Sequence, residues 1–193
     1  HLPLYRLEHI FERSGVSIAR STMCAWLQAA GELVQPLVTL MADRVRRSLV
    51  IHTDETRVPV QAPGEGRCRK GRIWTYIGDH QNPYIVYHYT PDRTRAGPTN
   101  WLAGYEGYLQ ADAYGGYDGI YHKGDVTEVA CWAHARRKFF DAKETDGRRS
   151  ARMLAMVREL YAVEGQAKGL SDAARLELRQ RESVPVLERI KAW

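Results

Sequence analysis

Three strand-like segments follow one another in the first half of the chain, with only turn residues between them. They are Leu49–Val60, which opens with a β-branched run, then Arg72–Gly78 and Tyr84–Tyr89. The intervening Gln61–Gly71 contains a proline and three glycines, and is predicted to be a loop. Strands joined by such short connections pair antiparallel, because a parallel pair needs a long crossover. The sequence therefore predicts an antiparallel meander.

The next segments alternate between helix and strand patterns. A helix is predicted over Ala96–Leu102, a strand over Gly107–Ala111 and, after a further helical stretch, a strand over Val126–Cys131. A last helix follows over Ala133–Lys143. The predicted order is β-β-β-α-β-α-β-α, which is typical of an α/β domain.

The side chains of that last helix separate into two faces, and we expect the apolar face to cover the sheet. The apolar face comprises Trp132, Ala135, Phe139 and Ala142, and the polar face comprises His134, Arg137, Lys138 and Asp141.

Helical patterns flank this core on both sides. Leu4–Val45 is predicted to form two helices around a break at Ser14-Gly15, with Ser21 or Thr22 as the N-cap of the second. This pair is either a DNA-reading helix-turn-helix, with Arg20 available to a phosphate, or two ordinary amphipathic helices. After Gly147 the pattern is helical with a break at Gly169. We predict a helical segment (residues 1–46), a catalytic core (47–146) and an incomplete helical insertion (147–193).

Composition limits the class of protein. The net charge of +5 favours a polyanionic partner. No apolar run is long enough to span a bilayer and the start lacks a signal-peptide pattern, so we expect a soluble, cytoplasmic protein. Cys24, Cys68 and Cys131 are odd in number and widely spaced, which fits a reducing compartment better than a disulfide framework. Because the sequence does not begin with Met, we expect a fragment.

Two aspartates are candidates for chemistry. Asp54 is predicted in the apolar neighbourhood of the first strand, and Asp112 at the end of a later strand. Burying two carboxylates on adjoining strands is unfavourable unless a cation lies between them. Carboxylates suit Mg²⁺ or Mn²⁺, and two such ions about 3.5–4 Å apart support phosphoryl transfer. The alternative is a strand-end cap and a turn acid.

Three motifs around these acids resemble the insertion-sequence 66 family of bacterial DDE transposases. They are His52-Thr53-Asp54-Glu55-Thr56, the segment Gln110–Tyr117 and the segment Cys131–Phe139. The resemblance extends from Leu4 to Lys143 and is weakest over the final helical stretch.

The resemblance implies a ribonuclease H-like fold, a five-stranded mixed sheet with flanking helices. It also implies that Asp54 and Asp112 are the first two metal-binding acids, that DNA is the partner, and that the intact protein is a homo-oligomer. In this family the third acid is a glutamate beyond an all-helical insertion, and no such context is found before Trp193. We therefore expect the chain to be truncated at both ends and inactive alone.

Glutamates within the chain are weaker candidates for the third acid. Glu144 follows the fifth strand, but near the end of the next helix. Glu55 adjoins Asp54 and should point to the opposite face of its strand. Glu128 is interpreted as a solvated strand residue.

His134 has two interpretations. The resemblance places it near the acids, where it contacts the scissile phosphate or a metal-bound water. It is equally well a packed residue at the start of a helix. Together with Cys131 it has the spacing of half a zinc site, but the other half is missing.

Basic and aromatic residues are candidates for DNA contact, although a solvated helix face, a basic hairpin tip or simple packing explains each of them as well. The candidates are Arg67, Arg69 and Lys70 on the predicted loop, Tyr114 after the second acid, and Arg136, Arg137 and Lys138 on the last core helix. Tyr117 is predicted to pack.

The predicted function is a transposase core that hydrolyses the phosphodiester at element ends and transfers the strand to target DNA. A nuclease or resolvase of the same fold is one alternative. A non-catalytic DNA-binding module or a decayed transposase remnant is another.

Overall fold

The computed structural model describes residues 2–62, 64, 66–122 and 125–193 of the chain. They form two compact units. The first comprises His1–Gln110 and Gly115–Glu128, and the second comprises Ala111–Tyr114 and Val129–Trp193. The predicted division into segments 1–46, 47–146 and 147–193 stays a prediction.

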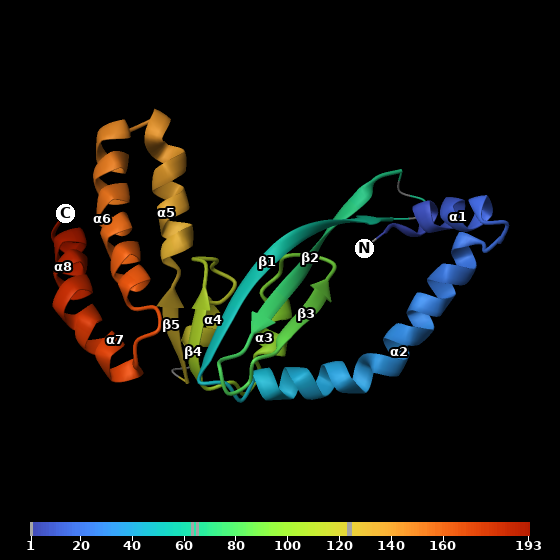
Figure 1. Cartoon of the computed structure of the whole chain (residues 1–193), viewed down its shortest axis with the longest axis horizontal. Coiled ribbons are helices and arrows are strands. Elements are labelled where there is room, and N and C mark those ends of the chain that lie inside the picture. Colours follow the sequence, from blue (N-terminus) through green and yellow to red (C-terminus); the bar gives the residue numbers. More distant parts are fainter. Residues whose placement is uncertain (1, 63, 65, 123–124) are drawn as a thin grey trace. The chain divides into compact units, whose positions relative to one another are not determined.

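A five-stranded sheet has the strand order β3-β2-β1-β4-β5 (Figure 1). The strands are β1 (Val50–Gln61), β2 (Cys68–Ile77), β3 (Ile85–Thr90), β4 (Gly107–Ala111) and β5 (Val126–Ala130). β1–β2 and β2–β3 are antiparallel, as the meander requires, whereas β1–β4 is parallel. The predicted mixed sheet with flanking helices, consistent with a ribonuclease H-like fold, is confirmed.

The β1–β2 ribbon is longer than predicted (Figure 1). The expected loop Gln61–Gly71 is wrong, because the two strands pair as far as Gln61 and Cys68. The glycines that the turn requires are Gly64 and Gly66, whose φ angles are 83° and 63°. Gly71 instead lies within β2, where an aromatic side chain of β3 fills the space that a Cβ would occupy. The glycines of this segment therefore have two roles: Gly64 and Gly66 form the turn, and Gly71 allows close packing within the sheet.

Aromatic side chains form much of the first unit's core. Trp74 and Tyr76 of β2 are fully buried. Trp101, the last residue of α3 (Ala96–Trp101), stacks on Tyr76 with a ring-centroid distance of 3.6 Å. Trp74 Nε1 donates to Thr90 Oγ1 at 2.8 Å, so its polar atom is satisfied inside the core. A short helix, α4 (Asp118–Tyr121), precedes β5.

The first unit begins with α1 (Leu4–Arg13) and α2 (Arg20–Val45), which confirms the predicted break between two helices. The predicted N-cap at Ser21 or Thr22 is wrong, because α2 begins earlier. Glu8 Oε1 of α1 accepts the backbone N–H of Arg20 at 2.9 Å, and Glu8 also pairs with the Arg20 side chain at 3.3 Å. A tertiary contact therefore caps this helix and engages the arginine expected to face a phosphate.

The second unit is helical, as the periodicity after Gly147 predicts. Its helices are α5 (Trp132–Asp141), α6 (Gly147–Gln166), α7 (Asp172–Leu178) and α8 (Val184–Ala192), with a 3₁₀ turn at Ala142–Glu144 and a π-helical turn at Arg179–Ser183. The predicted break at Gly169 is confirmed, since its φ angle is 79°. None of the described helices is long and apolar enough to cross a membrane.

One residue of the predicted apolar face of α5 packs within the second unit. Phe139 contacts a buried cluster formed by α6 and α8, whose members are Met153, Met156, Val157, Leu160 and Val186. The expectation that this face covers the sheet stays a prediction. The apolar stripe of α6 has helical spacing and needs covering, and α5 closely precedes α6 in the chain. Phe139 is half-buried in this way, whereas Trp132 of the same predicted face is 38% exposed and no residue of α5 is fully buried.

Candidate active site

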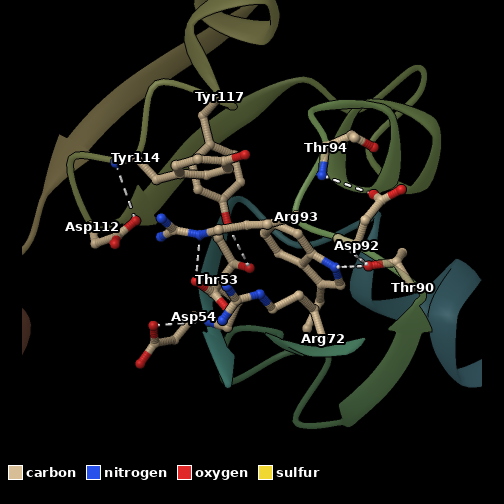
Figure 2. A network of polar contacts seen from close by, with 12 residues as sticks. Thr53, Asp54, Arg72, Thr90, Asp92, Arg93, Thr94, Asp112, Tyr114 and Tyr117 are labelled. Carbon is tan, nitrogen blue, oxygen red and sulfur yellow. Dashed lines mark hydrogen bonds and ion pairs between the residues drawn. The ribbon is translucent and has the colours of Figure 1, made fainter. Parts of the chain in front are cut away.

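Asp54 lies on the exposed face of β1. Along this strand Ile51 and Thr53 are buried, whereas His52 and Asp54 are exposed. The Oδ1 atom of Asp54 accepts the backbone N–H of Glu55 at 2.8 Å, which orients the carboxylate (Figure 2). The expectation of an apolar neighbourhood is thus wrong. Side chains alternate between the two faces of a strand, and Asp54 lies on the face exposed to solvent. A desolvation penalty therefore gives no argument for a cation at this residue.

The residues flanking Asp54 are fixed from inside the core. Thr53 Oγ1 lies 3.3 Å from the hydroxyl of Tyr117. Tyr117 is only 1% exposed and packs edge-to-face against Trp74, with ring centroids 6.2 Å apart. The prediction that Tyr117 packs is confirmed. The backbone that presents Asp54 is therefore held by a side chain from a distant segment.

Glu55, the next residue, is bound by two arginines that sequence reasoning missed. Its carboxylate lies 3.2 Å from Arg72 Nη1 and 2.5 Å from Arg93 Nε. Glu55 pairs directly with Trp74, so Arg72 is its diagonal neighbour on the same face of β2. In Figure 2 the side chains of Arg72 and Arg93 extend toward β1 from β2 and from the segment after β3. These contacts agree with the expectation that Glu55 is a poor co-ligand for a metal at Asp54.

Asp112 belongs to the second unit and directly follows β4, as predicted. It is half-buried, and its Oδ1 atom accepts the backbone N–H of Tyr114 at 3.2 Å (Figure 2). This side-chain bond to a residue two positions on is typical of an aspartate that shapes a turn. A carboxylate has acceptor sites on both oxygens, so the turn and a ligand role are compatible. Tyr114 is half-buried.

The strands that lead to the two aspartates are paired. β1 and β4 run parallel, with Ile51 opposite Leu109 and His52 opposite Gln110. In the sequence, Asp54 follows His52 by two residues, and Asp112 follows Gln110 by two residues. Asp54 lies within β1, whereas Asp112 is the first residue after β4.

The first turn of α5 carries His134. The helix is preceded by Cys131, whose carbonyl oxygen accepts the backbone N–H of His134 at 3.1 Å. His134 is half-buried, and both interpretations of its role stay predictions. The three basic residues after it, Arg136, Arg137 and Lys138, are exposed on the same helix.

The other predicted basic group lies mostly on a strand. Arg69 and Lys70 belong to β2 and are paired with Val60 and Pro59 of β1, so their assignment to a loop is wrong. Arg67 lies in the connection before β2. All three side chains are exposed, and the paired β1–β2 ribbon fixes the backbone of Arg69 and Lys70.

A third acid is not assigned. Glu144 is exposed in the 3₁₀ turn after α5, and Glu128 is exposed on β5, as interpreted. Within the part of the chain that the structure describes, no three histidine, cysteine, aspartate or glutamate side chains are grouped as a metal site. The carboxylate oxygens of Asp54 and Asp112 are nevertheless the hard ligands that Mg²⁺ and Mn²⁺ prefer.

Comparison with known proteins gives a match over residues 1–193 to the family described as "Transposase IS66 family". Three similar proteins come from Sinorhizobium fredii (strain NBRC 101917 / NGR234). "Uncharacterized protein y4qI" is 33% identical over 96% of this chain, "Uncharacterized protein y4hP" is 32% identical over 100%, and "Uncharacterized protein y4jD" is 30% identical over 100%. The matches cover 37%, 39% and 40% of these relatives, so the chain spans well under half of their length.

Proposed function

The chain belongs to the transposase IS66 family, and on that premise we propose that it is the core of a DDE-type DNA transposase. The proposed reaction is hydrolysis of the phosphodiester at transposon ends, followed by transfer of the freed 3′-hydroxyl to target DNA. The observation that carries the proposal is the parallel pairing of β1 with β4, each leading to an aspartate two residues beyond the pair His52 and Gln110.

In this proposal Asp54 and Asp112 are the residues that hold two Mg²⁺ or Mn²⁺ ions. When bound, such ions activate the attacking hydroxyl and stabilise the leaving oxygen at phosphorus. The contribution of the chain is orientation. The backbone N–H groups of Glu55 and Tyr114 each fix one oxygen of the adjacent carboxylate. Fixed carboxylates bind a cation with less loss of side-chain entropy than mobile ones.

Basic side chains are proposed to hold the DNA backbone. Phosphate contacts position a duplex without reading its sequence. The exposed groups are Arg67, Arg69 and Lys70 beside the ribbon, and Arg136, Arg137 and Lys138 on α5. Tyr114 is proposed to stack on an unpaired base, and His134 to contact the scissile phosphate. We further propose that the protein acts on DNA in the bacterial cytoplasm, at the nucleoid, as a homo-oligomer.

The test uses the intact protein and a DNA substrate carrying the transposon ends. Asp54→Asn and Asp112→Asn each remove one charged ligand while keeping the size of the side chain. We expect each to reduce metal-dependent cleavage by at least about 100-fold and to leave DNA binding largely in place. Asp172→Asn is the matched control, because the Asp172 side chain is 98% exposed at the start of α7. Retained cleavage in either site variant would contradict the assignment.

Two measurements separate the alternatives. A nuclease or resolvase cuts the DNA but gives no joined product in a strand-transfer assay. A non-catalytic DNA-binding module, which the pair of N-terminal helices and the basic charge balance favour, shows no Mn²⁺ uptake sensitive to Asp112→Asn by calorimetry.

A further inference from the structure

One face of α2 exposes an unusual number of large apolar side chains. Of the 26 residues in this helix, only Met23, Ala42 and Val45 are buried. The exposed apolar residues are Trp26 (58% exposed), Leu27 (60%), Leu33 (82%), Val34 (47%), Leu37 (58%) and Leu40 (53%). Isolated exposed leucines are common, but a continuous apolar face on one helix indicates an interaction surface.

The spacing of these residues is that of a coiled-coil heptad. Trp26, Leu33 and Leu40 are seven residues apart, and Ala30 and Leu37 lie between them at alternating steps of four and three. These five residues form what we call the α2 seam. Leu27 and Val34 widen it on one side. The stagger of three and four residues keeps the side chains on one stripe of the helix.

Where α2 packs against the sheet of its own unit, it uses a different face of the helix. Ala42 and Val45 are buried near the end of α2, where the helix contacts β3. At about 100° per residue, Val45 and Ala42 lie roughly 100° and 160° around the helix from the centre of the seam. Packing of α2 against its own sheet therefore leaves the seam exposed.

We propose that the α2 seam packs against the α2 seam of a second copy of this chain. Between Ser21 and Ala42 the only charged residue is Glu32, which is not part of the seam. Two copies therefore bring no like charges together along it. The absence of Lys and Arg from this stretch of sequence also disfavours a nucleic-acid partner, which requires basic side chains.

The exposed area is in the range that a specific dimer needs. A large apolar side chain carries on the order of 100 Å² of apolar surface, and a tryptophan about twice that. With the exposed fractions of the seam and its two flanking residues, each copy offers roughly 400 Å². A standard interface buries about 800 Å² per partner, of which somewhat more than half is apolar. The seam thus supplies most of the apolar part of such an interface.

The bend in α2 also favours an identical partner. Pro36 lies inside the helix, and Figure 1 shows that α2 changes direction along its length. A proline in a helix interior removes a backbone hydrogen bond and bends the axis. A straight helix from another protein would follow only part of such a seam. A second copy carries the same proline at the same position and can match the curve.

The test is sedimentation equilibrium of the chain at micromolar concentration. We expect the wild-type chain to sediment at twice its mass of 22.0 kDa, with a dissociation constant of about 10 µM or lower. Leu33→Glu combined with Leu37→Glu should give a monomer, because the seam would then hold four carboxylates. The matched control combines Gln35→Glu with Thr39→Glu, which adds the same two charges four residues apart on the opposite, exposed side of α2. It should remain dimeric.

A second measurement guards against misfolding. Circular dichroism of both variants should equal that of the wild type, and mixing the Leu33→Glu, Leu37→Glu chain with a Leu33→Lys, Leu37→Lys chain should restore a dimer through opposite charges. A monomeric wild type, a seam variant that stays dimeric, or a control that dissociates equally would each overturn the proposal. Sedimentation needs neither DNA nor metal. A monomeric wild type would therefore leave the proposed phosphodiester chemistry untouched, and a lack of DNA cleavage would leave the proposed dimer untouched.

Discussion

Glu55 carries a buried charge one residue from the proposed metal ligand Asp54. Its carboxylate is 9% exposed and is held by Arg72, which is 13% exposed, and by Arg93, which is 39% exposed. A buried carboxylate is tolerated here because two guanidinium groups compensate it. The same pairing fixes the strand residue next to Asp54.

Removing that charge should therefore destabilise the fold. Glu55→Gln leaves the Arg72 guanidinium buried with a weaker partner, and we expect a loss of about 2–3 kcal/mol in the free energy of unfolding, measured in urea. Asp43→Asn is the control, since Asp43 pairs with Arg46 at an exposed site and should lose less than about 1 kcal/mol. Equal losses in the two variants would show that the two arginines do not hold a buried charge.

For single residues, the sequence predicted which face of a strand a side chain occupies, but not which side chains it contacts. Strand alternation correctly separated Glu55 from Asp54, and Tyr117, which was predicted to pack, is buried. The two arginines were not predicted, because Arg72 becomes a diagonal neighbour of Glu55 only through the β1–β2 register. The exposure of Asp54 was also missed, since the buried Ile51 before it shares the strand but not its face.

A single carboxylate ties the ends of three strands together. Asp79, in the turn between β2 and β3, accepts the backbone N–H of Leu49 at 2.7 Å and those of Gln81 and Asn82 at 3.0 Å. Burial tends to raise the pKa of Asp79, but these N–H donors together hold its pKa below the ordinary value. The start of β1 is thereby fixed to the β2–β3 turn.

This turn should make stability depend on pH. Because the folded-state pKa is lowered, the Asp79 carboxylate contributes to stability above its unfolded pKa of about 3.9, and the contribution is lost as pH falls through the folded value. We expect Asp79→Asn to cost about 1 kcal/mol at pH 7, with the difference from wild type shrinking as pH falls below about 3.9. Urea unfolding at several pH values measures this. A difference that stays constant with pH would rule out the charge as its cause.

Elements were predicted well where local pattern dominates. All five strands and the main helices were found, because β-branched runs and helical periodicity are properties of short segments. The errors occur where distant contacts decide the outcome. The ribbon extends through a glycine-rich segment because its partner strand is in register, and α2 begins at Arg20 because Glu8 of another helix caps it.

The two compact units have separate apolar cores, and each core should respond to its own substitutions. Val157 is 1% exposed in the helical cluster of the second unit. Val157→Ala should cost about 2 kcal/mol, and its effect on amide hydrogen exchange should be confined to α5–α8. Leu176→Ala, at a residue that is 57% exposed, should change stability by no more than about 0.5 kcal/mol. If Val157→Ala reduced the protection of β1–β3 from amide exchange as much as that of α5–α8, the two cores would unfold together.

Pairing through α2 makes assembly depend on how much protein a cell produces. Because two chains must meet, the paired fraction rises with total concentration and becomes small well below the dissociation constant. A cell with one weakly expressed gene copy would hold mostly single chains, whereas a cell with many copies would hold pairs. The exposed leucines of a single helix thereby connect the assembled state of the protein to gene dosage.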